Sequence, residues 1–331
     1  MRILHLLILT FISGFIFPNN IYAQNKTDVT NIYSGLKFRN IGPALMSGRI
    51  SDIIIHPENQ NIWYVAAGSG GVWKTKNAGT TWHPLFDDEK SYSIGCITLD
   101  PQNTNIIWVG TGENVGGRHV GYGDGIYKST DAGKTWENMG LTKSEHISKI
   151  IIHPSDPNII WVAAQGPLWS KGEERGIYKS IDGGKNWNQT LGDKEWIGAT
   201  DLIIDPRNPN LLYAATWQRH RTVAGYMGGG PGTGIYKSND AGETWKKLNN
   251  GLPKSNMGKV GLAISPQKPD VIYAAIELDR RTGGVYRSEN KGSSWNKMSD
   301  AVAGGTGPHY YQELYASPHR YDEIYLADNY M

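Results

Sequence analysis

Arginine, histidine, tryptophan and tyrosine gather in four glycine-rich segments, at residues 112–125, 165–176, 217–234 and 277–284. A planar guanidinium suits a carboxylate, and a flat aromatic ring suits a sugar face or a peptide. Because functional residues concentrate on loops held by rigid scaffolds, we expect a ligand-binding face here. Its residues are Arg118, His119, Tyr122, Trp169, Arg175, Trp217, Arg219, His220, Arg221, Asp279 and Arg280.

Carboxylates that could serve an acid–base mechanism occur in or beside the same segments. An inverting glycosidase needs two carboxyl groups about 6.5–9.5 Å apart. The candidates are Glu113, Asp124, Glu145, Glu277 and Asp279. His119, His146 and His220 belong to different segments and lack metal-ligand spacing such as HExxH. The sequence therefore predicts no metal and no cofactor, and it names no catalytic residue.

The amino-acid composition argues against a nucleic-acid partner and favours an all-β fold. The 33 Lys and Arg residues nearly balance the 31 Asp and Glu residues, so no nucleic-acid partner is expected. The chain has 41 Gly, 12 Trp and 18 Tyr but only 5 Phe, which is typical of an all-β repeat protein with many tight turns. With one cysteine, Cys96, it can form no internal disulfide.

The first 23 residues have the pattern of a secretory signal peptide. Arg2 precedes an apolar stretch from Ile3 to Phe17, and Ala23 is a small residue at the expected cleavage point. The apolar stretch is short for a membrane anchor, which needs about 20 residues. We expect a signal peptide at 1–23, a linker at 24–35, and a secreted or periplasmic protein with no stable membrane insertion. The oligomeric state is not predicted.

Two motifs recur in phase along the rest of the chain, at intervals of about 50 residues. One is a β-branched run ending in His-Pro, Asp-Pro or Ser-Pro, followed by a second apolar run such as "NIIWVAA". The other is "GIYKS" followed by a turn and a tryptophan. Each unit therefore reads as four short strands, and the first two are apolar on both faces, as in stacked sheets. This predicts an all-β propeller of four-stranded antiparallel blades; a sandwich array is the alternative.

Alignment of the repeats places residues 36–331 in five complete units and a partial sixth. Phe38 aligns with Trp136, so the chain is expected to enter on an outer fourth strand of the last blade. The sixth copy of the first motif has no second motif after it. We expect truncation from a longer propeller, because an open apolar edge is a liability. A six-bladed ring with a defective last blade is the alternative.

The recurrent turn, "STDAGKTW" in its second copy, reads as scaffold. Gly133 can adopt the positive φ of a tight turn, and the Asp131 side chain can accept backbone N–H groups across it. Asn77 and Asn290 replace the aspartate in two copies, and an amide could not act as an acid or base. The structural positions are Asn77, Asp131, Asp182, Asp240 and Asn290, with Gly79, Gly133, Gly184, Gly242 and Gly292, and Trp82, Trp136, Trp187, Trp245 and Trp295.

The pattern SxDxGxTW resembles the Asp-box, or BNR repeat, of sialidases, sortilin-type propellers and secreted bacterial "glycosyl hydrolase" proteins. The segment "IIIHPENQNIWYVAAGSGGVWKT" is similar to two-propeller xyloglucan hydrolases, which carry an aspartate just before the Gly-Gly pair. Gly68 and Ser69 stand there in this chain. The sialidase "FRIP" segment is also missing; "FRNIGP" at 38–43 comes nearest. The resemblance implies a propeller with its Asp-boxes on the rim away from any active site.

Two functions stay open at this point. The first is a binding propeller that holds a glycan or peptide on its loop face. The second is a glycoside hydrolase, or a fragment of one, acting on a polysaccharide. In either case strand direction predicts that the loops between second and third strands share one face with the loops between repeats. The second group carries Arg49, Tyr92, His146, His309 and Tyr310.

Overall fold

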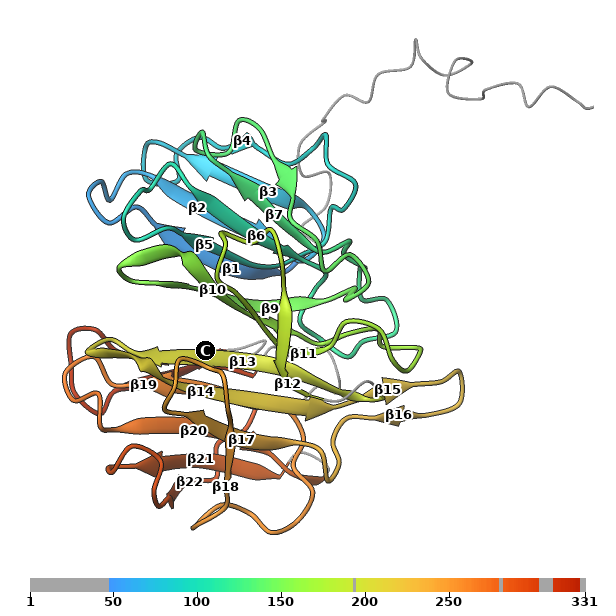
Figure 1. Cartoon of the computed structure of the whole chain (residues 1–331), viewed down its shortest axis with the longest axis vertical. Coiled ribbons are helices and arrows are strands. Elements are labelled where there is room, and N and C mark those ends of the chain that lie inside the picture. Colours follow the sequence, from blue (N-terminus) through green and yellow to red (C-terminus); the bar gives the residue numbers. More distant parts are fainter. Residues whose placement is uncertain (1–47, 193–194, 280–281, 304–311, 328–331) are drawn as a thin grey trace, which may run out of the picture. The chain divides into compact units, whose positions relative to one another are not determined.

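The computed structural model describes residues 48–192, 195–279, 282–303 and 312–327. Within these ranges the chain forms five antiparallel sheets of four strands, a sixth sheet of two, and one small added hairpin (Figure 1). No α-helix occurs among the described residues. The expected signal peptide, linker and Phe38 strand lie outside them, as do Arg280, His309 and Tyr310.

Each sheet repeats the same order along the sequence, so its strands are best named by their place in the repeat. First strands are β1 (Ile50–Ile55), β5 (Ile94–Leu99), β9 (Ile147–His153), β13 (Ile197–Asp205), β19 (Val260–Ile264) and β23 (Glu313–Ala316). Second strands are β2 (Trp63–Ala67), β6 (Ile107–Thr111), β10 (Asp156–Ala164), β14 (Asn208–Gln218), β20 (Ile272–Glu277) and β24 (Ile324–Ala327).

The outer half of each sheet comes from the second motif. Third strands are β3 (Gly71–Thr75), β7 (Ile126–Ser129), β11 (Gly176–Ser180), β17 (Gly234–Ser238) and β21 (Gly283–Ser288). Fourth strands are β4 (His83–Pro84), β8 (Glu137–Asn138), β12 (Asn188–Leu191), β18 (Lys246–Leu248) and β22 (Asn296–Ser299). The hairpin β15 (His220–Arg221) and β16 (Tyr226–Met227) interrupts the fourth sheet between β14 and β17.

Successive sheets pack face to face, with neighbouring first strands in contact from β1 through β23. The core between the second and third sheets combines Trp108 with Ile150 and Val162. Inner strands such as β6 are buried along their whole length, as their continuous apolar sequence predicts. This arrangement is consistent with propeller blades. The two end sheets are exceptions. Ile53 and Ile55 of β1 are each 50% exposed because no described sheet packs on that side, and Tyr325 of β24 is 46% exposed.

The recurrent turn is closed by side-chain hydrogen bonds, as the sequence predicts. The amides of Lys134 and Thr135 both donate to Asp131 Oδ1 at 2.9 Å, and Gly133 N donates to Ser129 Oγ at 2.8 Å. In the first copy Asn77 Oδ1 accepts the Thr81 amide at the same distance of 2.9 Å. An amide oxygen therefore serves as well as a carboxylate oxygen.

The tryptophan of this turn joins neighbouring sheets. Strand four begins one residue after it, rather than at the tryptophan itself. The Trp136 indole N–H donates to Leu85 O of the preceding sheet at 2.8 Å, and Trp187 donates to Met139 O at 2.8 Å. The indole ring thus lies under its own turn, and its N–H group forms a hydrogen bond with the preceding sheet.

Replacing Asp131 with asparagine should leave stability nearly unchanged, whereas Gly133→Val should lower the free energy of unfolding by about 1–3 kcal/mol. Gly133 has a φ of +88°, and an added Cβ would lie 2.6 Å from the Leu85 side chain. Thermal or urea unfolding of the two variants checks this. The reverse order of stabilities would contradict a scaffold role for the turn.

Candidate functional site

The loops between second and third strands lie at the same end of the sheets as the loops between repeats. Gly70 N donates to Tyr92 O at 3.0 Å, and Gly123 N donates to Glu145 O at 2.8 Å. At the other end the recurrent turns bond the loops between first and second strands, as in Ala132 N to Asn105 O. The predicted two-faced arrangement is confirmed. We call the first end the loop face.

Buried arginines hold the loop face together. Arg219 donates to Val115 O at 2.7 Å and to Gly166 O at 3.1 Å, so it joins the loops of the second and third sheets. Arg221 donates twice to Gly116 O, from Nε at 3.1 Å and from Nη2 at 2.9 Å. Burial lowers the pKa of Arg219 to about 9. These guanidiniums satisfy backbone carbonyls and are not presented to solvent.

We expected Trp217 and Arg219 on a ligand-binding loop, but the structure buries both side chains. Trp217 belongs to β14, pairs with Gly198, and is 2% exposed. Its indole N–H donates to Gly228 O at 2.9 Å, and Arg219 lies over its ring at 5.1 Å. Arg175 is likewise fully buried and donates to Pro167 O at 3.0 Å. No local pattern in the sequence indicates that these loops fold onto one another.

Other predicted residues remain accessible. Tyr122 is 55% exposed and Trp169 is 36% exposed. Arg118 and His119 are exposed in the loop of the second sheet, and Asp279 is exposed in that of the fifth. His220 is half-buried and packs on Trp196, with ring centroids 4.4 Å apart. These side chains are the part of the predicted set that can meet a ligand.

The candidate carboxylates lie in different settings. Glu113 is fully buried and pairs with Arg49, whose Nη2 donates to Glu113 Oε2 at 2.7 Å. Asp124 accepts the Tyr127 hydroxyl at 2.6 Å. Burial raises the pKa of Glu145, partly offset by Arg219. Glu113 and Asp124 therefore have structural partners and are poor choices for acid–base chemistry.

Glu277 and Asp279 border one cleft on the loop face. The cleft has a volume of about 710 Å³. Glu277 is the last residue of β20, and its Oε2 accepts the Lys259 amide at 3.1 Å. Further polar and aromatic lining comes from Tyr226, Ser255, Asn256 and Thr282. Hydroxyl, amide and carboxylate groups beside an aromatic ring are suited to binding a sugar.

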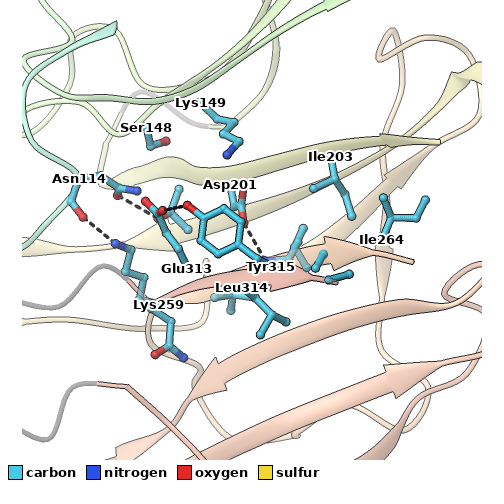
Figure 2. A pocket seen from close by; sticks show the side chains of 16 residues that line it. Asn114, Ser148, Lys149, Asp201, Ile203, Lys259, Ile264, Glu313, Leu314 and Tyr315 are labelled. Carbon is cyan, nitrogen blue, oxygen red and sulfur yellow. Dashed lines mark hydrogen bonds between the residues drawn. The ribbon is translucent and has the colours of Figure 1, made fainter. Parts of the chain in front are cut away.

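A second cavity, of about 190 Å³, lies among the first strands of the third to sixth sheets. We call it the first-strand cavity; Figure 2 shows it from close by. The side chains that define its chemistry are Asn114, Lys149, Asp201, Lys259, Gln312 and Glu313. Asp52 of β1 is not part of the lining but interacts electrostatically with Lys149.

This cavity was not predicted from the sequence, although a signal for it existed. One repeat position lies four residues before the His, Asp or Ser of the His-Pro, Asp-Pro or Ser-Pro motif. It is occupied by Asp52, Lys149, Asp201 and Glu313. A charged side chain inside an otherwise apolar strand is unusual and points to a special environment. Among the described residues, no cluster of His, Cys, Asp and Glu could hold a metal ion.

The electrostatics of the cavity centre on Lys149. Burial alone would lower its pKa, but the carboxylates of Asp52 and Asp201 outweigh burial and raise it. Burial raises the pKa of Asp52 and of Asp201 to about 6, and Lys149 limits the rise. Burial lowers the pKa of Lys259 to about 7. Several of these groups therefore change charge near neutral pH.

Replacing Asp201 with asparagine should change how stability depends on pH. The folded pKa of about 6 lies above the value of about 4 for an unfolded aspartate. Ionisation then costs the folded state stability as pH rises through this window. Relative to wild type, the variant should gain about 1 kcal/mol between about pH 5 and pH 7. Urea unfolding at both pH values measures it; a constant difference would contradict the raised pKa.

The chain has xyloglucanases among its relatives. It is 25% identical over 317 residues to "Xyloglucanase Xgh74A" of Acetivibrio thermocellus, which covers 85% of this chain and 34% of that protein. It is 24% identical over 225 residues to an oligoxyloglucan-reducing end-specific xyloglucanase of Emericella nidulans, covering 62% of this chain and 25% of that protein. The chain thus spans about a third or less of these two relatives. No protein-family model matches.

Solved structures show the same fold. An ancestral GH74 enzyme matches with a TM-score of 0.60 at 20% identity, covering 82% of this chain and 33% of the other. The GH74 enzyme of Niastella koreensis gives 0.59 at 20% identity, covering 80% and 42%. YCF48 bound to D1 peptide gives 0.50 at 16% identity, covering 78% and 70%. The likeness supports a propeller fold; a sortilin-type relationship stays a prediction.

Proposed function

We propose that this chain is a polysaccharide-binding propeller portion of a glycoside hydrolase, acting on a xyloglucan-like glucan. The observation that carries the proposal is the 25% identity to a xyloglucanase along 85% of the chain. This favours the hydrolase over a pure binding protein, which our sequence reasoning placed first. The expected peptide ligand has no comparable support.

The loop face supplies the features that such a substrate needs. The exposed rings of Tyr122 and Trp169 can lie against the apolar faces of sugar units. Glu277 and Asp279 supply carboxylates in the neighbouring cleft. We assign glycan binding to these four residues, together with the exposed Arg118 and His119.

Replacing Tyr122 and Trp169 together with alanine should weaken binding of xyloglucan by at least about tenfold, because each buried ring contact contributes about 1 kcal/mol or more. Retardation of the protein in gels that contain xyloglucan measures the affinity. The melting temperature should stay unchanged, since both rings are exposed. Tyr321→Ala is the matched control, because Tyr321 lies between β23 and β24 at the other end of the sheets. Equal retardation of all variants would contradict the assignment.

Binding without cleavage is the second candidate function. Its support is the sequence at Gly68 and Ser69, where the xyloglucan hydrolases that the segment resembles carry an aspartate. Release of reducing sugar ends from xyloglucan distinguishes the two. Release that is lost in Glu277→Gln or Asp279→Asn supports hydrolysis at the cleft, whereas binding with no release supports this second candidate.

We also infer that the six sheets are blades of a propeller whose sixth blade is completed by further strands. The support is the exposed apolar surface of β1 and of the two-stranded sixth sheet, where Tyr325 is 46% exposed. Secretion or periplasmic location remains part of the proposal, resting on residues 1–23. No helix in the described part of the chain is long and apolar enough to cross a membrane.

A further inference from the structure

The first-strand cavity contains donors that have no acceptor. Gln312 is 1% exposed and lines the cavity, and its Nε2 has no hydrogen-bond partner among the described residues. Its Oε1 is already used, since it accepts the Ala303 amide at 3.1 Å. Lys149 points toward Asp201 (Figure 2), yet no hydrogen bond or ion pair within the described part of the chain reaches its ammonium group. A buried donor without an acceptor is costly.

The acceptors around the cavity, by contrast, are largely occupied. Asp201 accepts the amides of Leu202 at 2.8 Å and Leu262 at 2.7 Å. Asp52 accepts two backbone amides in the same way, from Ile53 at 2.9 Å and from Ile97 at 3.1 Å. The carboxylates therefore fasten adjacent first strands, and the groups left to interact with a guest are chiefly N–H donors.

The charge balance excludes an anion as the preferred guest. The carboxylates of Asp52, Asp201, Glu277 and Glu313 interact electrostatically with Lys149 or Lys259. Arg219 is a third cation beside Lys259, so four carboxylates face three cations. A carboxylate or phosphate would be repelled by this excess. A cation would be repelled by the Lys149 ammonium group, and few oxygen atoms in the cavity are free to coordinate it. A neutral molecule with many oxygen atoms can accept hydrogen bonds from the N–H donors, and it is repelled neither by the carboxylates nor by Lys149.

We propose that the first-strand cavity binds a small neutral polyhydroxy molecule of the monosaccharide class. The volume of about 190 Å³ equals that of about six water molecules, so one sugar ring can replace a water cluster there. Hydroxyl oxygens accept from Lys149 and Gln312, and hydroxyl hydrogens donate to Glu313. Asn114 of the 112–125 loop also lines this cavity, but none of the residues assigned above to glycan binding does, and the inference does not depend on the proposed function.

Saturation-transfer NMR and calorimetry on the full chain, with D-glucose and D-xylose as probes, test the proposal. We expect one of these sugars to bind in the millimolar range, while acetate and methylammonium do not. Lys149→Met should weaken the sugar at least about tenfold, which is about 1.4 kcal/mol. Lys246→Met, which removes an exposed lysine of β18, should have no effect. Retardation by xyloglucan should be unchanged in Lys149→Met, which separates this site from the loop face.

A second variant guards against a folding defect. Gln312→Leu removes only the unpartnered amide and its bond to Ala303. It should also weaken sugar binding, while a cooperative unfolding transition and a wild-type circular-dichroism spectrum show that the variant is folded. A xyloglucan oligosaccharide can bind here only if its terminal ring enters the cavity. Competition between this oligosaccharide and D-glucose shows whether the cavity accepts a chain end as well as a free sugar. No binding by either sugar, preferential binding of acetate, or equal affinity in wild type and both variants would overturn the proposal.

Discussion

Replacing Trp217 with alanine should lower the free energy of unfolding by about 3–5 kcal/mol. Its ring is 2% exposed and lies beneath both Arg219 and Lys259, at 5.1 Å and 5.4 Å from the ring centroid. Truncation would open a cavity and also leave the carbonyl of Gly228 without its indole donor. Urea unfolding followed by circular dichroism measures the loss.

The matched control for this prediction is Trp169→Ala. Trp169 lies in the loop of the third sheet and is 36% exposed. Its removal should change the free energy of unfolding by less than about 0.5 kcal/mol. Similar losses in the two variants would show that Trp217 does not organise the loop face.

Arg49→Met should lower the free energy of unfolding by about 3 kcal/mol, because it removes the Arg49 guanidinium from the buried carboxylate of Glu113. The Glu113 side chain has no exposed surface, whereas that of Arg49 is 29% exposed. The double variant Arg49→Met with Glu113→Gln should recover most of the loss, since a neutral amide is cheaper to bury.

An exposed ion pair provides the comparison. Lys143 and Glu173 lie 3.4 Å apart, with side chains 68% and 45% exposed. Lys143→Met should change stability by no more than about 1 kcal/mol. If Arg49→Met were equally mild, or the double variant were less stable than the single one, the buried pair would not stabilise the fold.

Local chemistry made the sheets and turns predictable. Four-strand units, the two faces and the closure of the turn by Asp131 or Asn77 all follow from short-range patterns. The burial of inner strands such as β6 on both faces follows from their apolar runs. The sequence also marked the loop-face residues as a group, because they lie in segments of variable length at one repeat position.

Long-range packing was not predictable in the same way. The hydrogen bond from Arg219 to Val115 O joins residues from different sheets, and no local sequence pattern near either residue predicts it. The same is true of Gln312, whose unpartnered amide depends on the side chains of other sheets. Burial of polar groups is decided by how the loops fold together, so the amino-acid sequence alone could not separate buried from exposed arginines.

Hydrogen–deuterium exchange with and without xyloglucan tests the loop-face assignment most directly. We predict that xyloglucan protects the backbone amides of residues 112–125 and 165–176, around Tyr122 and Trp169. The recurrent turns at the other end of the sheets, such as residues 129–136, should exchange at the same rate with and without the polysaccharide. Protection confined to those turns, or no protection at saturating xyloglucan, would contradict the proposed function.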